Sequence, residues 1–206
     1  MTIPLPQRIN VEEVIASSYR NFHAKGMDYV CLHRDQALTL KLYFFDGDVS
    51  KLPEVVNPHD HRYSFRTWVV AGAGQNIWYE PGDEHDAHFQ QFDWATPLLG
   101  GDGFKWHQEV MLRESRRETF AAGESYFMRA PEIHTIRMVK NETVLFLAQF
   151  EDTVPPDWPT STFTMSDVAP PIGDDLYTRF KPDELLALLK RFEERTGYRF
   201  QTDART

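Results

Sequence analysis

Residues 57–69 read NPHDHRYSFRTWV, a run whose aromatic residues are typical of a β-strand. In an extended chain successive side chains point to opposite faces, so His59 and His61 share one side and Asp60 lies on the other. Two neutral imidazoles in one small space each present a lone pair, which water or a cation must satisfy. The stretch therefore predicts a strand that carries two metal ligands.

The sequence around this stretch, from residue 29 to residue 150, has a β-rich texture. Short runs of Val, Tyr, Phe, Leu and Thr alternate with turn signals such as DGD at 46–48 and GAG at 72–74. The pattern predicts a mostly β sandwich or barrel. The candidate strands are 29–33, 37–45, 54–61, 64–71, 75–80, 106–113, 117–120, 124–129, 134–139 and 143–151.

One segment interrupts this texture. Residues 81–105 are polar and punctuated by glycine, which predicts a long insertion or a lid loop. Within it, His85 and His88 are spaced i, i+3 among acidic residues. They could bind a second ion if the stretch were helical, but a solvated acidic loop is the favoured interpretation.

Two helices are predicted, one toward each end of the chain. Asn10 is a good N-cap for a helix over 11–25, with acidic residues in its first turn and Gly26 as its stop. Residues 182–196 have apolar residues at helical spacing, and Gly197 closes them. Between barrel and helix, the proline-spaced segment after residue 151 predicts an irregular arm. We expect a single domain over 1–206, with its barrel at about 28–151 and its C-terminal arm and helix at 152–206.

Composition narrows the class of protein. The 206 residues carry 22 basic and 31 acidic side chains, a formal charge of −9 at pH 7, and no basic stripe that could follow a phosphate backbone. Nucleic acid is therefore an unexpected partner. The single cysteine, Cys31, excludes an intrachain disulfide. Neither a signal peptide nor an apolar run of about 18 residues is evident, so we expect a cytoplasmic protein without membrane contact.

A third histidine completes a wider pattern. The first sequence motif of the cupin superfamily runs G-x5-H-x-H-x3,4-E-x6-G, and the second runs G-x5-P-x-G-x2-H-x3-N. His59, His61 and Gly72 match the first, and Gly123 and His134 match the ends of the second at the expected distance. Residues 50–150 thus resemble a cupin. The resemblance implies a double-stranded β-helix, or jelly-roll barrel, that holds a metal ion through the three histidines.

The chain departs from these motifs at several positions. Where the first motif has glutamate, this chain has Phe65 or Arg66, and Arg129, Pro131 and Met138 replace the proline, glycine and asparagine of the second. Loss of the glutamate with retention of three histidines is similar to thiol dioxygenases of the cysteine dioxygenase type. That resemblance implies Fe(II) as the cofactor. Imidazole also suits other divalent ions, so Zn, Ni and Mn remain open.

Arginines near the motifs suggest an anionic substrate, because a guanidinium can hold a carboxylate through two hydrogen bonds. The candidate anchors are Arg66 and Arg129. On an uninterrupted strand Arg62 and Arg66 would face away from His59 and His61. The direction of Arg129 is open in the sequence.

Three functions follow from this reading. The first is a non-haem iron dioxygenase or other oxygenase that uses O₂ on a small anionic substrate, such as a thiol acid or an amino acid. The second is a zinc- or nickel-dependent lyase or isomerase that uses the same ligands. The third is a non-catalytic cupin that binds a small molecule. A homodimer is also expected, from the resemblance to cupins and from the need to cover sheet edges.

Overall fold

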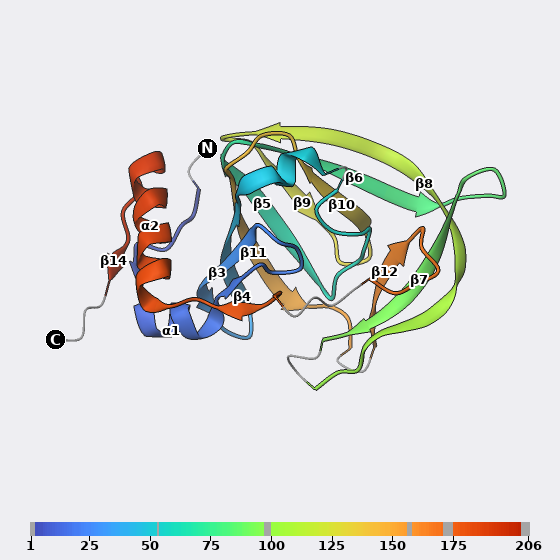
Figure 1. Cartoon of the computed structure of the whole chain (residues 1–206), viewed down its shortest axis with the longest axis horizontal. Coiled ribbons are helices and arrows are strands. Elements are labelled where there is room, and N and C mark those ends of the chain that lie inside the picture. Colours follow the sequence, from blue (N-terminus) through green and yellow to red (C-terminus); the bar gives the residue numbers. More distant parts are fainter. Residues whose placement is uncertain (1–2, 53, 97–99, 156–157, 171–174, 203–206) are drawn as a thin grey trace.

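Two antiparallel β-sheets form most of the chain, and two helices flank the larger one (Figure 1). This computed structural model describes residues 3–52, 54–96, 100–155, 158–170 and 175–202. Within them the larger sheet has the order β13-β2-β3-β4-β11-β5-β9. Its strands are β13 (Thr178–Arg179), β2 (Tyr19–Arg20), β3 (Met27–Arg34), β4 (Leu38–Phe45), β11 (Thr143–Asp152), β5 (Tyr63–Ala71) and β9 (Ser125–Met128).

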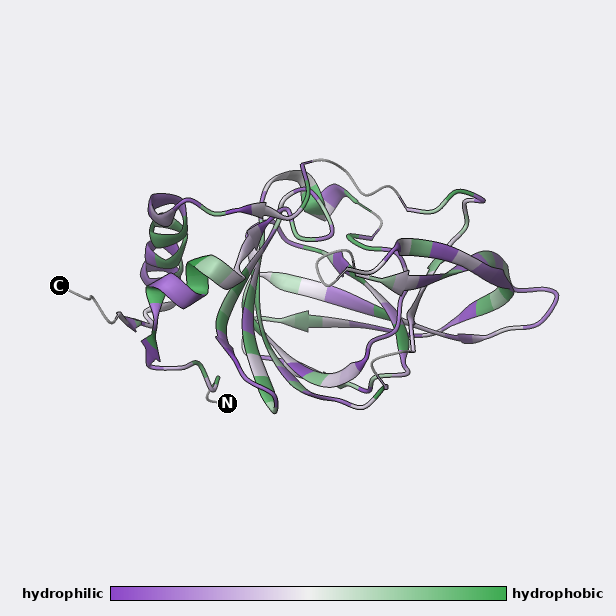
Figure 2. Ribbon diagram, turned by 90° about the horizontal axis from the view of Figure 1, so that it is seen from below, coloured by the Kyte–Doolittle hydropathy of each residue, from purple (hydrophilic) through white to green (hydrophobic). Residues whose placement is uncertain are grey.

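The smaller sheet has the order β10-β6-β8-β7-β12. After β5 the chain repeatedly passes from one sheet to the other, and the two curled sheets enclose a shared interior, as in a jelly-roll barrel (Figures 1 and 2). The predicted mostly β, jelly-roll fold is confirmed. The strands are β10 (Ile133–Met138), β6 (Ala73–Pro81), β8 (Gly103–Ala121), β7 (Ala87–Ala95) and β12 (Thr160–Thr164).

Side chains from both sheets fill the barrel interior. Alternation along each strand sends one set of residues inward, and these residues form one buried cluster across the two sheets. Aromatic and large aliphatic side chains dominate it, including Tyr29, Tyr43, Phe65, Trp78, Met128 and Leu147. A smaller cluster of Phe89, Leu112 and Phe163 supports the far end of the five-stranded sheet.

A second core lies outside the barrel, between the seven-stranded sheet and the helices (Figure 2). The helix α2 (Pro182–Thr196) buries Leu185, Leu188, Leu189 and Phe192 against the outward residues of the sheet, among them Phe44 and Phe146. Pro182 at its first turn and Gly197, with φ of 72°, at its end are the predicted start and stop. The short helix α1 (Val11–Ser17) packs Val14 into the same core.

The turn between β5 and β6 requires a glycine. Gly72 has a φ of +78°, and a Cβ at this position would lie 2.8 Å from the Cα of Thr143. A larger residue would therefore be strained by its backbone and also clash with the neighbouring strand. This turn connects β5 of the larger sheet to β6 of the smaller one, and β5 is the strand that follows His59 and His61.

The N-terminal helix is shorter than the predicted 11–25. It starts at the expected N-cap, Asn10, but ends at Ser17. The hydroxyls of Ser17 and Ser18 bond back to carbonyls of the preceding turn, and Ser18 takes an extended backbone. Asn21 and His23 then have φ of 50° and 64°, which no helix continues through.

Two further predictions were wrong. Residues 81–105 are not a lid loop, because residues 87–95 form β7 and residues 103–105 begin β8, at the end of the molecule away from the helices (Figure 1). The polar sequence misled because β7 buries only Phe89, Gln90 and Phe92, and its other residues are exposed or partly exposed. Residues 106–113 and 117–120 belong to one strand, β8, and not to two.

Residues 54–61 were predicted as a strand but are irregular. Residues 54–61 form an irregular segment with bends that follows the short 3-10 helix η1 (Gly47–Lys51), and His59 makes isolated bridges. The proline before His59 has no backbone N–H to donate to a neighbouring strand, which disfavours regular pairing.

No helix of the described ranges is long and apolar enough to cross a membrane.

Candidate metal centre

The three histidines meet at one place in the barrel. The backbones of His59 and His134 exchange two hydrogen bonds, of 2.9 and 3.0 Å, so the irregular segment is fastened to β10. The backbone N–H of His61 donates to the carbonyl of Ala130 at 2.9 Å. The alternation predicted for His59 and His61 holds over these residues, since Asp60 points away and accepts a hydrogen bond from the N–H of Ser161.

The imidazole rings face one another. The ring centroid of His59 lies 4.6 Å from that of His61 and 5.0 Å from that of His134, and the last two centroids are 5.1 Å apart. One nitrogen of each ring lies within 4.8 Å of the other two. In the described part of the chain no other cluster of three or more histidine, cysteine or acidic side chains has this spacing.

The outer nitrogens of two rings are already occupied. The Nδ1 of His59 lies 2.8 Å from the carbonyl oxygen of Asn57, and the Nδ1 of His134 lies 2.7 Å from Oδ1 of Asn76. Because these oxygens only accept, each Nδ1 carries the proton and each Nε2 keeps its lone pair. Such outer hydrogen bonds orient histidine ligands in metal sites.

The inner nitrogens have a spacing that suits one ion. The Nε2 atoms of His61 and His134 lie 2.8 Å apart, close enough to share an ion at metal–nitrogen distances of about 2.0–2.1 Å. Asn76 is itself 1% exposed, so the partner that orients His134 is fixed by the core. The donor set therefore fits a divalent metal ion.

The environment keeps all three imidazoles neutral. Burial lowers the pKa of His134 well below its usual value, and proximity to His59 lowers it further. Burial is the main cause that lowers the pKa of His61 well below its usual value, and the proximity of His59 and His134 lowers this pKa further. Burial also lowers the pKa of His59. At pH 7 each ring is thus in the deprotonated form that metal binding requires.

Aromatic rings form the wall around the centre. The ring of Phe65 lies 4.8 Å from that of His61 and 5.9 Å from that of His134, and the ring of Tyr63 lies 5.4 Å from that of His61. His134 is 4% exposed, whereas His59 and His61 keep part of their surface accessible. Two of the three ligand residues are therefore partly exposed, and the third is buried.

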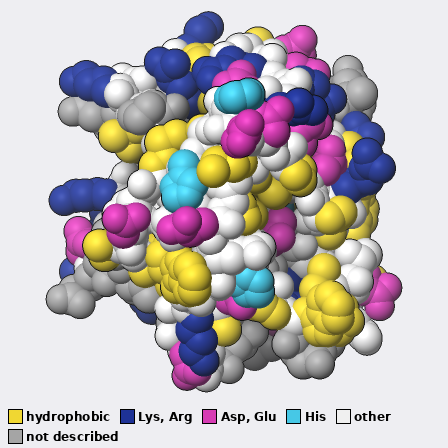
Figure 3. Space-filling model, turned by 90° about the vertical axis from the view of Figure 1, so that its right-hand side faces the viewer, with side chains coloured by type: hydrophobic (Ala, Val, Ile, Leu, Met, Phe, Trp, Pro, Cys, Tyr) yellow, Lys and Arg dark blue, Asp and Glu magenta, His cyan; other side chains and the backbone are white. Residues whose placement is uncertain are grey.

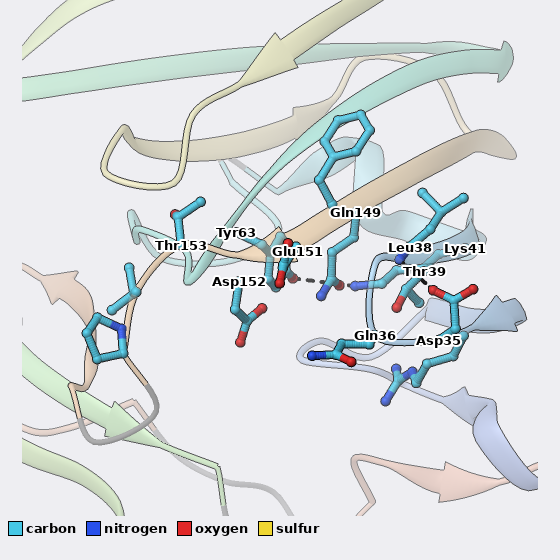
Figure 4. A pocket seen from close by; sticks show the side chains of 14 residues that line it. Asp35, Gln36, Leu38, Thr39, Lys41, Tyr63, Gln149, Glu151, Asp152 and Thr153 are labelled. Atoms are coloured by element: carbon cyan, nitrogen blue, oxygen red, sulfur yellow. Dashed lines mark hydrogen bonds between the residues drawn. The ribbon is translucent and has the colours of Figure 1, made fainter.

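A pocket of about 720 Å³ lies beside the centre, at the end of the seven-stranded sheet (Figure 4). The β3–β4 hairpin and the C-terminal end of β11 form most of its wall, and Tyr63 and Lys41 line its inner part. Because the Tyr63 ring also packs on His61, this residue joins the pocket to the three histidines.

The arginines predicted as substrate anchors lie elsewhere. Arg66 shares the outer face of β5 with Trp68, while Phe65 faces the histidines; its guanidinium lies 6.0 Å from the Trp68 ring and donates to Ser125. The side chain of Arg129 is 75% exposed and lies 3.7 Å from Glu132. The structure does not bring either residue to the metal centre.

The side chains of the remaining sequence candidates have partners other than the three histidines. Arg62 bonds the carbonyl of Val154 and lies 3.4 Å from Asp152. His88 lies 3.3 Å from Glu109 on the exposed ribbon, and His85 occupies an exposed turn. Figure 3 shows this end of the molecule, where histidines are scattered among acidic, basic and hydrophobic side chains and do not gather in one place.

Sequence reasoning missed Lys41. This lysine is 4% exposed and occupies an inward position of β4, between Thr39 and Tyr43. A signal was present in the sequence LTLKLYFF, where the lysine alternates with leucines that pack outside the barrel. Assigning the face of each residue in that strand would have placed the lysine inside.

Comparison with known proteins finds similarity only among solved structures. No protein family and no curated protein matches the sequence. KdgF from Halomonas sp. is 13% identical, with 61% of this chain and 82% of that chain covered and a TM-score of 0.37. An RmlC-like cupin from Shewanella frigidimarina is 14% identical, with 65% and 85% covered and a TM-score of 0.36.

Hydroxypropylphosphonic acid epoxidase from S. wedmorenis is 13% identical, with 73% of this chain and 59% of that chain covered and a TM-score of 0.40. Sequence identities and TM-scores this low report only a partial overlap of the backbones. The chemistry of the site has to be argued from the side chains of this chain. The chain therefore combines a jelly-roll fold with a centre of three neutral histidines that can hold a divalent metal ion.

Proposed function

We propose that the protein is a non-haem iron oxygenase that acts on a small anionic molecule, such as a thiol acid or an amino acid. The observation that carries the proposal is the convergence of His59, His61 and His134 with their donor nitrogens within 4.8 Å of one another. Three neutral ligands leave the charge of a divalent ion uncompensated, which favours an anionic substrate. When bound, ferrous iron would supply the redox chemistry.

The protein side chains have separate tasks in this proposal. Asn76 fixes the tautomer and the angle of the His134 ring through Nδ1, and the carbonyl of Asn57 does the same for His59. Phe65 excludes water from the inner side of the rings. Tyr63 forms the boundary between the histidines and the pocket that would admit the substrate.

Metal analysis of protein purified without an affinity tag tests the proposal. About one iron per chain is expected, and a His134→Ala variant should lose it. The matched control is His88→Ala, since His88 is an exposed histidine that pairs with Glu109 and should leave the metal content unchanged. Oxygen consumption by the iron-loaded protein is then screened with small thiol acids and amino acids.

Other metal contents would change the conclusion. Stoichiometric zinc or nickel held by the same histidines would replace the oxygenase with a lyase or isomerase. Protein that binds no divalent ion in carefully controlled loading experiments would overturn the enzymatic proposal and leave a barrel that binds a small molecule.

A further inference from the structure

Lys41 is a cation inside the barrel. Its side chain starts from the inner face of β4, and only 4% of the residue is exposed. Burying an ammonium group is unfavourable unless an opposite charge or several hydrogen bonds compensate it. The partners of Lys41 therefore indicate what the site is built to receive.

Among the described residues the direct contacts of the Lys41 ammonium are aromatic, and the acidic side chains that line the same pocket make no hydrogen bond or ion pair with it. Its Nζ donates one hydrogen bond, at 3.4 Å, to the hydroxyl of Tyr63. The same nitrogen lies 4.9 Å from the ring centroid of Tyr63 and 5.7 Å from that of Tyr29. None of the ion pairs among the described residues includes Lys41, and Asp152, at the rim of the pocket, pairs with Arg62.

The position of Lys41 relative to the metal centre is also informative. Lys41 and Tyr63 both line the pocket of about 720 Å³, and the ring of Tyr63 lies 5.4 Å from that of His61. One aromatic ring thus separates the ammonium group from the nearest proposed metal ligand. A short molecule in the pocket can contact the ammonium, and its far end would reach the histidines past the Tyr63 ring.

We propose that Lys41 is the subsite for a carboxylate group of the substrate. One ammonium group neutralises one carboxylate, and after its bond to Tyr63 it has two N–H donors left for the two carboxylate oxygens. A phosphate dianion would leave one charge uncompensated in the same buried place. The inference extends the proposed function, in that the far end of the same molecule would react at the metal centre.

Binding of propionate to metal-free, chelator-treated protein tests the subsite. Thermal unfolding midpoints are measured against propionate concentration at constant ionic strength, with inorganic phosphate and chloride as comparison anions, and each titration gives an apparent Kd. The variants are Lys41→Met, which keeps the length of the side chain, Lys41→Arg, which keeps its charge, and His134→Ala. The matched control is Lys190→Met on the exposed face of α2.

Propionate should stabilise the wild type, His134→Ala and Lys190→Met with similar Kd values. Lys41→Met should bind at least tenfold more weakly, and Lys41→Arg should retain part of the affinity. Equal affinity in the wild type and Lys41→Met would overturn the inference, and so would stabilisation by phosphate that exceeds that by propionate. Retained propionate binding without iron binding would refute the proposed function while leaving the subsite intact.

Discussion

Replacing Lys41 by methionine should make the metal-free protein more stable at pH 7. The substitution keeps an unbranched side chain of similar length at a position that is 4% exposed, so it removes the buried charge with little change in packing. It also removes one hydrogen bond, the 3.4 Å contact with Tyr63. A site built for stability alone would not retain the lysine.

The pKa of Lys41 gives the size and the sign of the effect. Burial is the main cause that lowers this pKa from 10.5 to about 7; Arg34 lowers it further, whereas Cys31 and Asp152 act in the opposite direction. The phenol of Tyr63 also faces the ammonium, and its own pKa is raised to about 12, so it stays neutral. At about 1.4 kcal/mol for each pH unit, the unfavourable contribution of the charged lysine is at most about 5 kcal/mol.

The contribution depends on pH in a defined direction. Below pH 7 the lysine is protonated in both the folded and the unfolded state, so the full cost is present. Between pH 7 and pH 10.5 the unfolded chain binds the proton more strongly, and the stability of the wild type therefore rises with pH. Replacing a buried ion pair by apolar residues is often neutral or stabilising by about 1–4 kcal/mol, and for the unpaired Lys41 we expect Lys41→Met to gain an amount in this range at pH 7.

Urea unfolding of the metal-free wild type and Lys41→Met at pH 7, 8 and 9 measures this difference. The advantage of the variant should shrink by up to about 1.4 kcal/mol for each pH unit. A variant that is less stable than the wild type at every pH would refute the reasoning, because it would mean that the folded protein already compensates the charge. A constant advantage would show that the lysine stays protonated in the folded as in the unfolded state, so that folding does not lower its pKa.

Three further predictions concern the metal centre and the barrel. Asn76→Ala should weaken metal binding by about 10–100-fold in a chelator competition assay, because the ring it orients would lose its partner, whereas Gln75→Ala on the other face of β6 should not. Gly72→Ala should lower the unfolding free energy by more than about 2 kcal/mol, and Gly123→Ala, whose Cβ meets nothing within 4 Å, by about 1 kcal/mol; equal losses would contradict the steric argument. The metal-free protein should lose stability as the pH falls below about 6.5, since the folded state holds the three histidines at lowered pKa values; a flat acid profile would contradict this.

Local patterns predicted the parts of the protein that depend on neighbouring residues. The i, i+2 spacing of His59 and His61 placed both rings on one side, although the segment is not a regular strand. Helical spacing with Pro182 and Gly197 gave the exact limits of α2. In each case the decisive interactions lie within one element.

Features that depend on distant parts of the chain could not be predicted in this way. Strand parity indicated that Arg66 faces away from the histidines, but its hydrogen bond to Ser125 depends on the pairing of β5 with β9. Lys41 is 18 residues before the first ligand, and only the pairing of β4 with β11 and of β11 with β5 brings it beside Tyr63. The strand β7 was missed because few of its residues are apolar, and its pairing with β8 and the packing of Phe89 on Leu112 and Phe163 involve distant parts of the chain.

The two ends of the chain are joined by a parallel pair of short strands. β1 (Arg8–Ile9) aligns with β14 (Gln201–Thr202), and the hydroxyl of Tyr198 donates to the carbonyls of Leu5 and Pro6. Pairing β1 with β14 closes a loop of more than 190 residues. The entropic cost of closing this loop is smaller once the folded barrel has brought the two strands near each other. We expect the closure to be among the last events of folding, and a fluorescence probe at this junction would report completed molecules separately from those whose barrel alone has formed.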